Sequence, residues 1–247
     1  MSKKLSVKKG IDKSPQVFQR EKLKNELHIR ERNDLTAKQI EILKTALDKD
    51  TRCIMLDGVF GTGKSFLAVL ASLKLLSQKK VDQIIYVRNP IESSKTGKLG
   101  FLKGDLEEKM TPYASIVYDK LEELLPPSEI EILKSECRVD AIPLGFVQGK
   151  SWACKAVIVD ECSNLAYEDF VMLLTRCGEF TRIFFIGDGI NQNYLPKDQS
   201  GFLKMFSKFN DELSRQNGIH CFELKEKADV VRSGFVRFVL EHLEIIR

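Results

Sequence analysis

One stretch of eight residues limits what this chain can fold into more than any other. Gly58 to Ser65 reads Gly-Val-Phe-Gly-Thr-Gly-Lys-Ser, and it follows the apolar run Cys53–Asp57 and leads into the helix-forming run Lys64–Ser77. Glycines at these places let the backbone curl with its N–H groups pointing inward at a helix N-terminus, where the helix dipole favours an anion. The pattern therefore predicts a strand, a phosphate-binding loop and a helix in that order.

Short apolar runs alternate with amphipathic segments along the rest of the chain. That order favours an α/β fold, a single P-loop NTPase domain with a mostly parallel central sheet and helices on both faces. The predicted strands are Cys53–Asp57, Ile84–Arg88, Ala156–Asp160, Arg182–Gly187 and Ile219–Leu224. The predicted helices are Thr36–Lys49, Lys64–Ser77, Leu106–Leu124, Tyr167–Cys177, Gly201–Ser214 and Val230–Ile246. The last contains an apolar i+4 series, which predicts a buried stripe of Val231, Phe235, Val239 and Leu243.

Two irregular regions interrupt this pattern. Pro126 and Pro127 predict a break in the middle helical region, and the glycine-containing stretch Ile91–Asp105 is long enough to be a functional loop. This loop can neutralise nucleic-acid phosphates, or it can simply be solvated. Its candidate contacts are Lys95, Lys98 and Lys103.

Composition bounds the class of protein. With 247 residues, 43% of them hydrophobic and 30% charged, the chain suits one large globular domain. No apolar run reaches the ~18 residues that span a bilayer, and no apolar leader follows the first lysines, so we expect a cytoplasmic protein without a membrane segment. Six scattered cysteines and three histidines favour reduced thiols over a zinc site.

Positive charge is concentrated at the start of the chain. The formal net charge is +4, but residues 1–32 contain ten Lys and Arg against four acids, so they carry +6 and the remainder carries −2. We expect 1–32 to be a basic, partly disordered extension and 33–247 to be the P-loop domain. A basic extension suits the backbone of RNA or DNA, and a solvated flexible tail is the alternative.

The residues around the phosphate loop predict ATP and Mg²⁺ as ligands. Lys64 would reach the β- and γ-phosphates, and the Ser65 hydroxyl would bind Mg²⁺. The run Ala156–Asp160 delivers Asp160 and Glu161 at its carboxyl end, where the sites of parallel sheets lie. Asp160 would hold the magnesium and Glu161 would orient or deprotonate the attacking water. Taken alone, such an acidic pair often only caps a helix.

Two further elements could complete this site. The run Arg182–Gly187 would lie between the other two strands and bring Asp188, Asn191 or Gln192 near the γ-phosphate, although an ordinary Gly-Asp turn is the alternative. Gln39 could hydrogen-bond the adenine edge, or it could be a surface glutamine. The residues expected to contact the nucleotide are Gln39, Gly58, Val59, Phe60, Gly61, Thr62, Gly63, Lys64, Ser65 and Phe66.

Together these residues resemble the PhoH family of phosphate-starvation-inducible ATPases. Beyond the P-loop and the acidic pair, the likeness rests on Val87–Pro90, Leu99–Tyr113 and Asp229–Arg232, and it covers roughly residues 33–240. It implies a core like the first RecA-like half of a superfamily-one helicase. It also implies action on single-stranded RNA or DNA, in which Arg88 either grips the phosphate backbone or serves ATP.

Three positions depart from the family pattern. Ser163 and Asn191 each stand where the family usually has glutamine, and Lys103 stands where it has proline. The change at Ser163 puts the coupling between ATP and nucleic acid in doubt. These departures and the short length are typical of a compact member, such as a phage-encoded one, and no nuclease domain is visible.

A single RecA-like core presents only one wall of a nucleotide site. Charge that develops on the γ-phosphoryl group usually needs an arginine from another domain or subunit. We therefore expect a homo-oligomer, a hexameric ring by the family resemblance, in which Arg232 or Arg176 acts in trans. Either arginine could instead be a salt-bridged surface residue.

Three functions compete at this point. The leading interpretation is an ATP-hydrolysing, helicase-like motor or remodeller that acts on single-stranded RNA or DNA. The alternative is an ATP-dependent oligomeric switch or scaffold without nucleic-acid translocation. A small-molecule kinase is disfavoured, because Glu161 beside Asp160 suits the activation of water.

Overall fold

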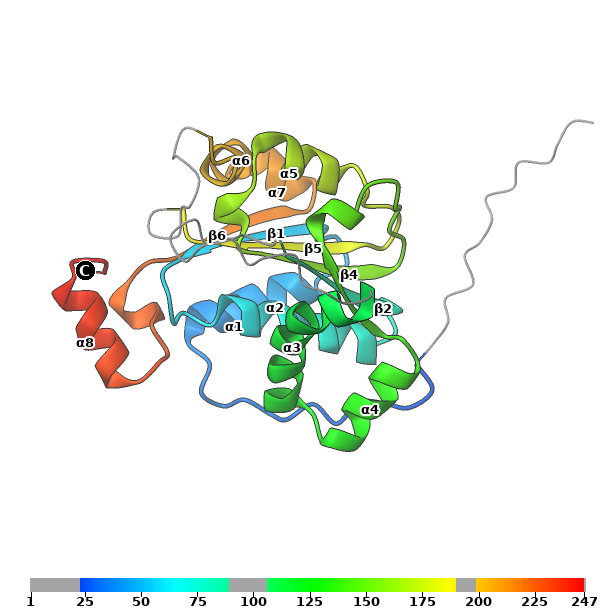
Figure 1. The fold of residues 1–247 in the computed structure, drawn as a ribbon. Helices are drawn as coiled ribbons and strands as arrows, with labels where there is room; N and C mark the ends of the chain where they lie inside the picture. Colours follow the sequence, from blue (N-terminus) through cyan, green and yellow to red (C-terminus); the bar gives the residue numbers. More distant parts are fainter. Residues whose placement is uncertain (1–22, 89–105, 190–198, 247) are drawn as a thin grey trace, which may run out of the picture.

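The computed structural model describes residues 23–88, 106–189 and 199–246 (Figure 1). Its strands are β1 (Cys53–Gly58), β2 (Gln83–Arg88), β3 (Val139–Pro143), β4 (Lys155–Asp160), β5 (Arg182–Gly187) and β6 (Ile219–Leu224). Its α-helices are α1 (Ala37–Leu47), α2 (Lys64–Ser77), α3 (Leu106–Leu124), α4 (Pro127–Ser135), α5 (Tyr167–Leu174), α6 (Phe202–Phe209), α7 (Glu212–Gln216) and α8 (Gly234–His242). The 3-10 turns are η1 (Leu144–Phe146), η2 (Cys162–Asn164) and η3 (Lys227–Asp229).

Within the described residues, six strands form one parallel sheet in the order β3-β2-β4-β5-β1-β6. β5 pairs with both β1 and β4 and lies between them, as the sequence predicted. The expected α/β fold with a parallel sheet is therefore confirmed. The carboxyl ends of β1 and β4 open at the same edge of the sheet, on either side of β5, where ligands of such sheets bind.

Each strand contributes to two cores, because successive side chains point to opposite faces of a sheet. In β4, Ala156 and Ile158 lie in the core shared with α2, whereas Val157 and Val159 lie in the core shared with α5 and α6. Figure 1 shows α1, α2, α3 and α4 on one face and α5, α6 and α7 on the other. Every residue from Leu67 to Leu73 of α2 is buried, so the helix that follows the phosphate loop is firmly held.

Some predicted elements need correction. The five predicted strands are present with ends shifted by at most one residue, but β3 was missed; it has five residues, pairs only with β2 and carries an exposed Asp140. The break predicted at Pro126 and Pro127 is confirmed, because α3 ends at Leu124 and a separate helix, α4, begins at Pro127, a position where the missing N–H costs nothing. The predicted helix Gly201–Ser214 is two helices, because the Asp211 side chain accepts a hydrogen bond from the Ser214 N–H (2.7 Å) and starts α7.

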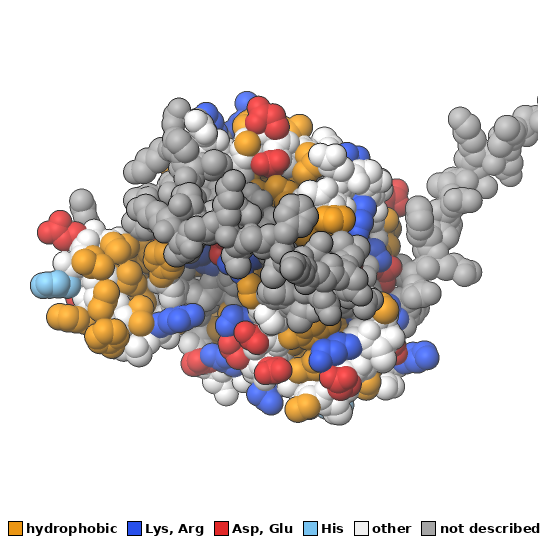
Figure 2. Space-filling view, viewed as in Figure 1, with side chains coloured by type: hydrophobic (Ala, Val, Ile, Leu, Met, Phe, Trp, Pro, Cys, Tyr) orange, Lys and Arg blue, Asp and Glu red, His pale blue; other side chains and the backbone are white. Residues whose placement is uncertain are grey.

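The buried stripe predicted for the last helix is wrong. Val231, Phe235 and Leu243 are 44%, 74% and 61% exposed, and Phe238 is also exposed. α8 instead buries Leu240 in a small core with Val59, Val230 and Ile246. Figure 2 shows the resulting cluster of hydrophobic side chains on α8. An i+4 series identifies an apolar face, but it does not reveal whether another element of the same chain covers that face.

The segment before α1 packs on the body of the domain. Leu23 is buried, the backbone N–H of His28 donates to the Glu129 carboxylate of α4 (2.9 Å), and the Arg30 N–H donates to the Leu124 carbonyl of α3 (2.9 Å). The described part of the expected extension, residues 23–32, therefore lies across α3 and α4. In the part of the chain that the structure describes, no helix is both long and apolar enough to cross a membrane.

Candidate nucleotide-binding site

The phosphate loop has the backbone that its glycines predict. Gly61 and Gly63 both have φ of +79°, a conformation that L side chains rarely adopt. Gly63 is also the N-cap of α2, and it has no side chain with which to cap the helix. The first N–H groups of α2 therefore remain available to an anion, and the helix dipole adds to the attraction.

Lys64 lies at the centre of the loop. Its Nζ donates to the carbonyl oxygens of Gly58 (2.7 Å) and Val59 (2.8 Å). Burial lowers the pKa of Lys64, while the nearby carboxylates of Asp188 and Asp160 act in the opposite direction. The ammonium is thus poorly solvated, and a phosphate would provide the charge compensation that water provides elsewhere.

Asp160 faces the loop from the carboxyl end of β4. Its Oδ2 lies 3.3 Å from the Ser65 Oγ and also accepts a hydrogen bond from the Tyr86 hydroxyl, while its Oδ1 accepts from the Glu161 N–H (2.8 Å). Burial, and then the Asp160 charge, raise the pKa of Tyr86, so Tyr86 acts as a donor. A serine hydroxyl and one carboxylate suit Mg²⁺ that also binds phosphate oxygens and water.

Glu161 is held away from Asp160 by an arginine. Its backbone is left-handed (φ 57°, ψ 39°), and its carboxylate forms an ion pair with Arg88. Burial acts to lower the pKa of Arg88, but the ion pair with Glu161 and the nearby Tyr86 and Asp160 together raise the pKa above its ordinary value. Arg88 stands opposite Asp160 in the β2–β4 register. Arg88 therefore contacts a residue of the cavity without lining the cavity itself, and both of its predicted roles stay predictions.

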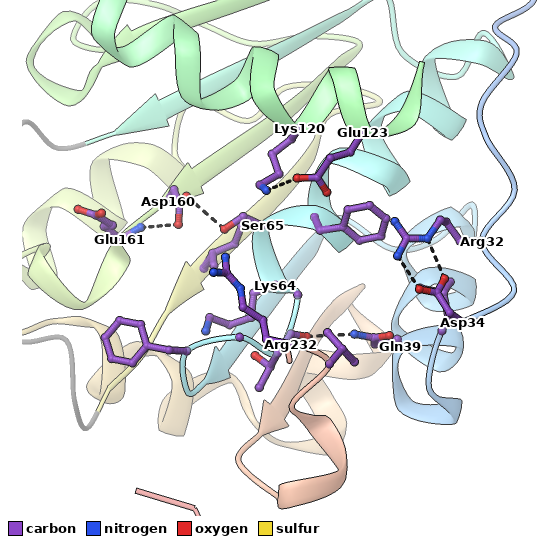
Figure 3. A pocket seen from close by; sticks show the side chains of 18 residues that line it. Arg32, Asp34, Gln39, Lys64, Ser65, Lys120, Glu123, Asp160, Glu161 and Arg232 are labelled. Atoms are coloured by element: carbon purple, nitrogen blue, oxygen red, sulfur yellow. Dashed lines mark hydrogen bonds and ion pairs between the residues drawn. The ribbon is translucent and has the colours of Figure 1, made fainter. Parts of the chain in front are cut away.

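Lys64, Ser65, Asp160 and Glu161 line a cavity of about 460 Å³ at the edge of the sheet (Figure 3). That volume is within the range of sites for small ligands and cofactors. Its lining residues are Arg32, Asp34, Leu35, Gln39, Phe60, Gly61, Thr62, Gly63, Lys64, Ser65, Phe66, Lys120, Glu123, Asp160, Glu161, Ile186, Val231 and Arg232.

The side-chain amide of Gln39 hydrogen-bonds the backbone of Thr36 and of Thr62 in the phosphate loop. Its Oε1 accepts from the Thr36 N–H and its Nε2 donates to the Thr62 carbonyl, both at 3.1 Å. The side chain lines the cavity, but the residue is only 2% exposed. These contacts join α1 to the phosphate loop, and they use one donor and one acceptor position of the amide, so the predicted role of reading an adenine edge stays a prediction.

Arg232 lies along the loop of its own chain. A Cβ added at Gly61 would be 3.1 Å from the Arg232 Cγ, and the neighbouring Val231 N–H donates to the Gly61 carbonyl (3.0 Å). Arg232 thus lines the cavity of its own chain, and the predicted role in trans stays a prediction. Arg176, the other candidate, follows α5 and does not line this cavity.

The remaining predicted residues divide into two groups. Val59 packs in the small core that α8 covers. Asp188 is 1% exposed, and its charge acts to raise the pKa of Lys64. Neither these two nor Gly58 lines the cavity. The second group lies outside the described residues and consists of Lys95, Lys98, Lys103, Asn191 and Gln192.

The sequence is similar to those of known proteins over most of its length. A family model described as PhoH-like protein matches residues 29–244, most of the chain. The chain belongs to the PhoH family. It is 33% identical over 210 residues to a PhoH-like protein of Synechocystis sp., a match that covers 85% of this chain and 61% of that protein.

Other PhoH relatives show the same degree of similarity. A PhoH-like protein of Bacillus subtilis is 33% identical over 184 residues, which cover 74% of this chain and 56% of that protein. Protein PhoH of Escherichia coli is 32% identical over 198 residues, which cover 79% of this chain and 51% of that protein. The chain thus spans about half to three fifths of the length of these relatives.

The departure from the PhoH pattern at Ser163 has a structural role here. The fully buried Ser163 hydroxyl accepts from the Asp188 N–H (2.8 Å) and donates to the Asp188 carbonyl (2.7 Å). The Ser163 carbonyl in turn accepts from the Ser200 hydroxyl (2.8 Å). Ser163 joins the ends of β4 and β5, and it cannot contact a nucleic acid from this position.

Two parts of the site were missed from the sequence. For Tyr86 the sequence did contain a signal. Tyr86 is two residues before Arg88 on β2, and strand alternation puts such side chains on the same face of the sheet. The cluster of Arg32, Asp34, Lys120 and Glu123 had no comparable signal, because it is assembled from segments far apart in the chain.

Proposed function

We propose that this chain binds ATP in the cavity and hydrolyses it to ADP and phosphate. The observation that carries the proposal is the 3.3 Å approach of the Ser65 hydroxyl to the Asp160 carboxylate at the mouth of the phosphate loop. It brings together an anion-binding loop, a pair of oxygen ligands and, next in the chain, the Glu161 carboxylate. Family membership supports the proposal independently.

Each group has a distinct task in this scheme. The N–H groups at the start of α2 and the Lys64 ammonium bind the β- and γ-phosphates and balance the charge that develops on them. Glu161, oriented by Arg88, positions the attacking water and accepts its proton. Arg232 adds positive charge along the loop. Mg²⁺, when bound by Ser65, Asp160 and phosphate oxygens, supplies Lewis-acid stabilisation.

Two substitutions test the proposal. Lys64→Ala is expected to abolish ATP binding and turnover, whereas Glu161→Gln is expected to keep ATP binding and lower kcat by about 10²- to 10⁴-fold. Lys134→Ala and Glu131→Gln, which alter an exposed ion pair on α4, are the matched controls. Turnover within about twofold of the wild type in both site variants, a difference of only ~0.4 kcal/mol, would rule out this mechanism.

We extend the proposal to a homo-oligomer, a hexameric ring, that acts on single-stranded RNA or DNA. Family membership and the +6 charge of residues 1–32 support a nucleic-acid partner. The exposed Phe235 and Phe238 of α8, together with the C-cap residue Leu243, support self-association, because monomers rarely expose such groups together.

One experiment distinguishes the motor from the switch. ATP hydrolysis is measured with and without single-stranded RNA and DNA at low salt, and subunits are counted by native mass spectrometry. Stimulation that declines steeply as salt rises is the result expected of a motor. A nucleotide-stabilised oligomer whose rate no oligonucleotide changes would favour the switch.

A further inference from the structure

The cavity extends well beyond the phosphate loop. Its far half is formed by Arg32 and Asp34 from the segment before α1, by Phe66 from the first turn of α2, and by Lys120 and Glu123 from α3. Figure 3 shows Arg32, Asp34, Lys120 and Glu123 on the side of Ser65 away from Glu161. None of them has a role in the hydrolytic scheme above.

Arg32 is fixed in this half as a flat surface. Its guanidinium carbon lies 4.6 Å from the centre of the Phe66 ring, and its Nε and Nη2 each donate to one oxygen of Asp34 at 2.7 Å. Two parallel hydrogen bonds along one edge and a ring against one face restrict both the tilt and the rotation of the guanidinium. A planar cation held in this way is suited to stack on an aromatic ligand.

Charge distinguishes the two halves of the cavity. Lys120 Nζ lies 2.6 Å from Glu123 Oε1. The far half therefore contains two ion pairs, Arg32–Asp34 and Lys120–Glu123, and each pair has no net charge. A neutral, polar lining has little attraction for phosphate. It suits an uncharged ring whose N–H groups can donate to carboxylate oxygens.

We propose that the far half binds the base of a purine nucleoside triphosphate, with the Arg32–Phe66 pair as a stacking wall and the Asp34 and Glu123 carboxylates as hydrogen-bond acceptors. The inference rests on the proposed function, because a triphosphate held at the loop must place its nucleoside in the remaining part of the cavity. It replaces Gln39 as the base-reading residue, since the amide of Gln39 is engaged by Thr36 and Thr62.

Binding of four ligands tests this assignment by titration calorimetry. The ligands are tripolyphosphate and nonhydrolysable analogues of ATP, GTP and CTP, each with Mg²⁺. Arg32→Ala is expected to weaken the two purine analogues about tenfold, the CTP analogue less, and tripolyphosphate by no more than about twofold. Arg32→Lys keeps the charge but lacks the planar fork, and it should resemble Arg32→Ala. Arg215→Ala, in an exposed pair on α7, is the matched control.

The possible outcomes separate the two proposals. If the wild type binds neither tripolyphosphate nor any analogue, the proposed function fails. If the wild type binds them all and Arg32→Ala weakens all four equally or none, only the base assignment fails. Should Arg32→Ala not fold, Glu123→Gln, at an exposed pair, is expected to weaken the purine analogues about threefold and leave tripolyphosphate unchanged. If that variant lost the same factor of affinity for every ligand, or none for the purine analogues, the assignment would also be overturned.

Discussion

The two halves of the cavity are built in different ways. The phosphate half is built around one continuous segment, Gly61–Ser65, whose backbone N–H groups are complemented by Asp160, Glu161 and Arg232. The far half, to which we assign the nucleoside, contains side chains such as Arg32, Phe66 and Glu123, from segments that only the fold brings together. A change in the first half should therefore weaken every triphosphate alike, whereas a change in the second should alter the choice among bases.

The largest effect expected in a direct test of this contrast comes from Gly63→Ala. The new side chain requires a left-handed alanine, and its Cβ would be 3.0 Å from the Gln39 Nε2. Such strain costs about 1–3 kcal/mol, so tripolyphosphate and the ATP analogue should both bind about 10- to 100-fold more weakly. Titration calorimetry with both ligands measures this.

Gly149→Ala provides the control for that substitution. Gly149 has nearly the same φ, +80°, but nothing lies within 4 Å of an added Cβ. Its substitution imposes the same backbone strain far from any contact, and it should leave both affinities unchanged. If Gly63→Ala weakened the ATP analogue but not tripolyphosphate, the division into two halves would be wrong.

A smaller effect is expected from Tyr86→Phe, which removes the hydroxyl that donates to Asp160. A hydrogen bond to a charged group contributes roughly 1.5 kcal/mol, so kcat should fall about tenfold. The relative affinities for ATP and GTP analogues should not change, because Tyr86 lies on the phosphate side. Steady-state kinetics and binding measure the two properties, with the partly exposed Tyr118→Phe as control. A change in base preference would contradict the assignment.

The smallest effect on ligand choice is expected from Gln39→Ala. Loss of the contacts to Thr36 and Thr62 should lower the free energy of unfolding by about 1–2 kcal/mol, measured by urea denaturation. The ratio of ATP to GTP affinity should remain the same within experimental error. A marked loss of ATP preference would restore the glutamine to the adenine-reading role.

The difference between the two halves also explains which parts of the fold and of the site could be predicted from the sequence. The phosphate loop, five strands and the Asp160–Glu161 pair follow from local patterns, because a backbone nest and a buried strand each need particular residues at fixed spacing. Arg32 was missed because its partner Phe66 is 34 positions away, and no local rule relates the two. Contacts of this kind are set by tertiary packing.

The helices teach a related lesson. α2 is buried at every residue from Leu67 to Leu73. At α8, Phe235 and the C-cap residue Leu243 continue an apolar i+4 series, yet both residues are exposed, and Leu240 makes the internal contact. Hydrophobic periodicity predicts a helix, but the surface that receives its apolar face depends on the rest of the fold and on any partner.

The valine inside the phosphate loop connects that loop to the end of the chain. Val59 offers its carbonyl to Lys64, while its side chain sits under α8 against Leu240. If the proposed triphosphate binds only to the loop conformation that this packing supports, then docking of α8 and binding of the triphosphate favour each other by the same factor. A protease that cleaves α8 only when this helix detaches from the domain would then act more slowly on the ligand-bound protein. The rate of cleavage at α8 would report how much of the nucleotide site is occupied.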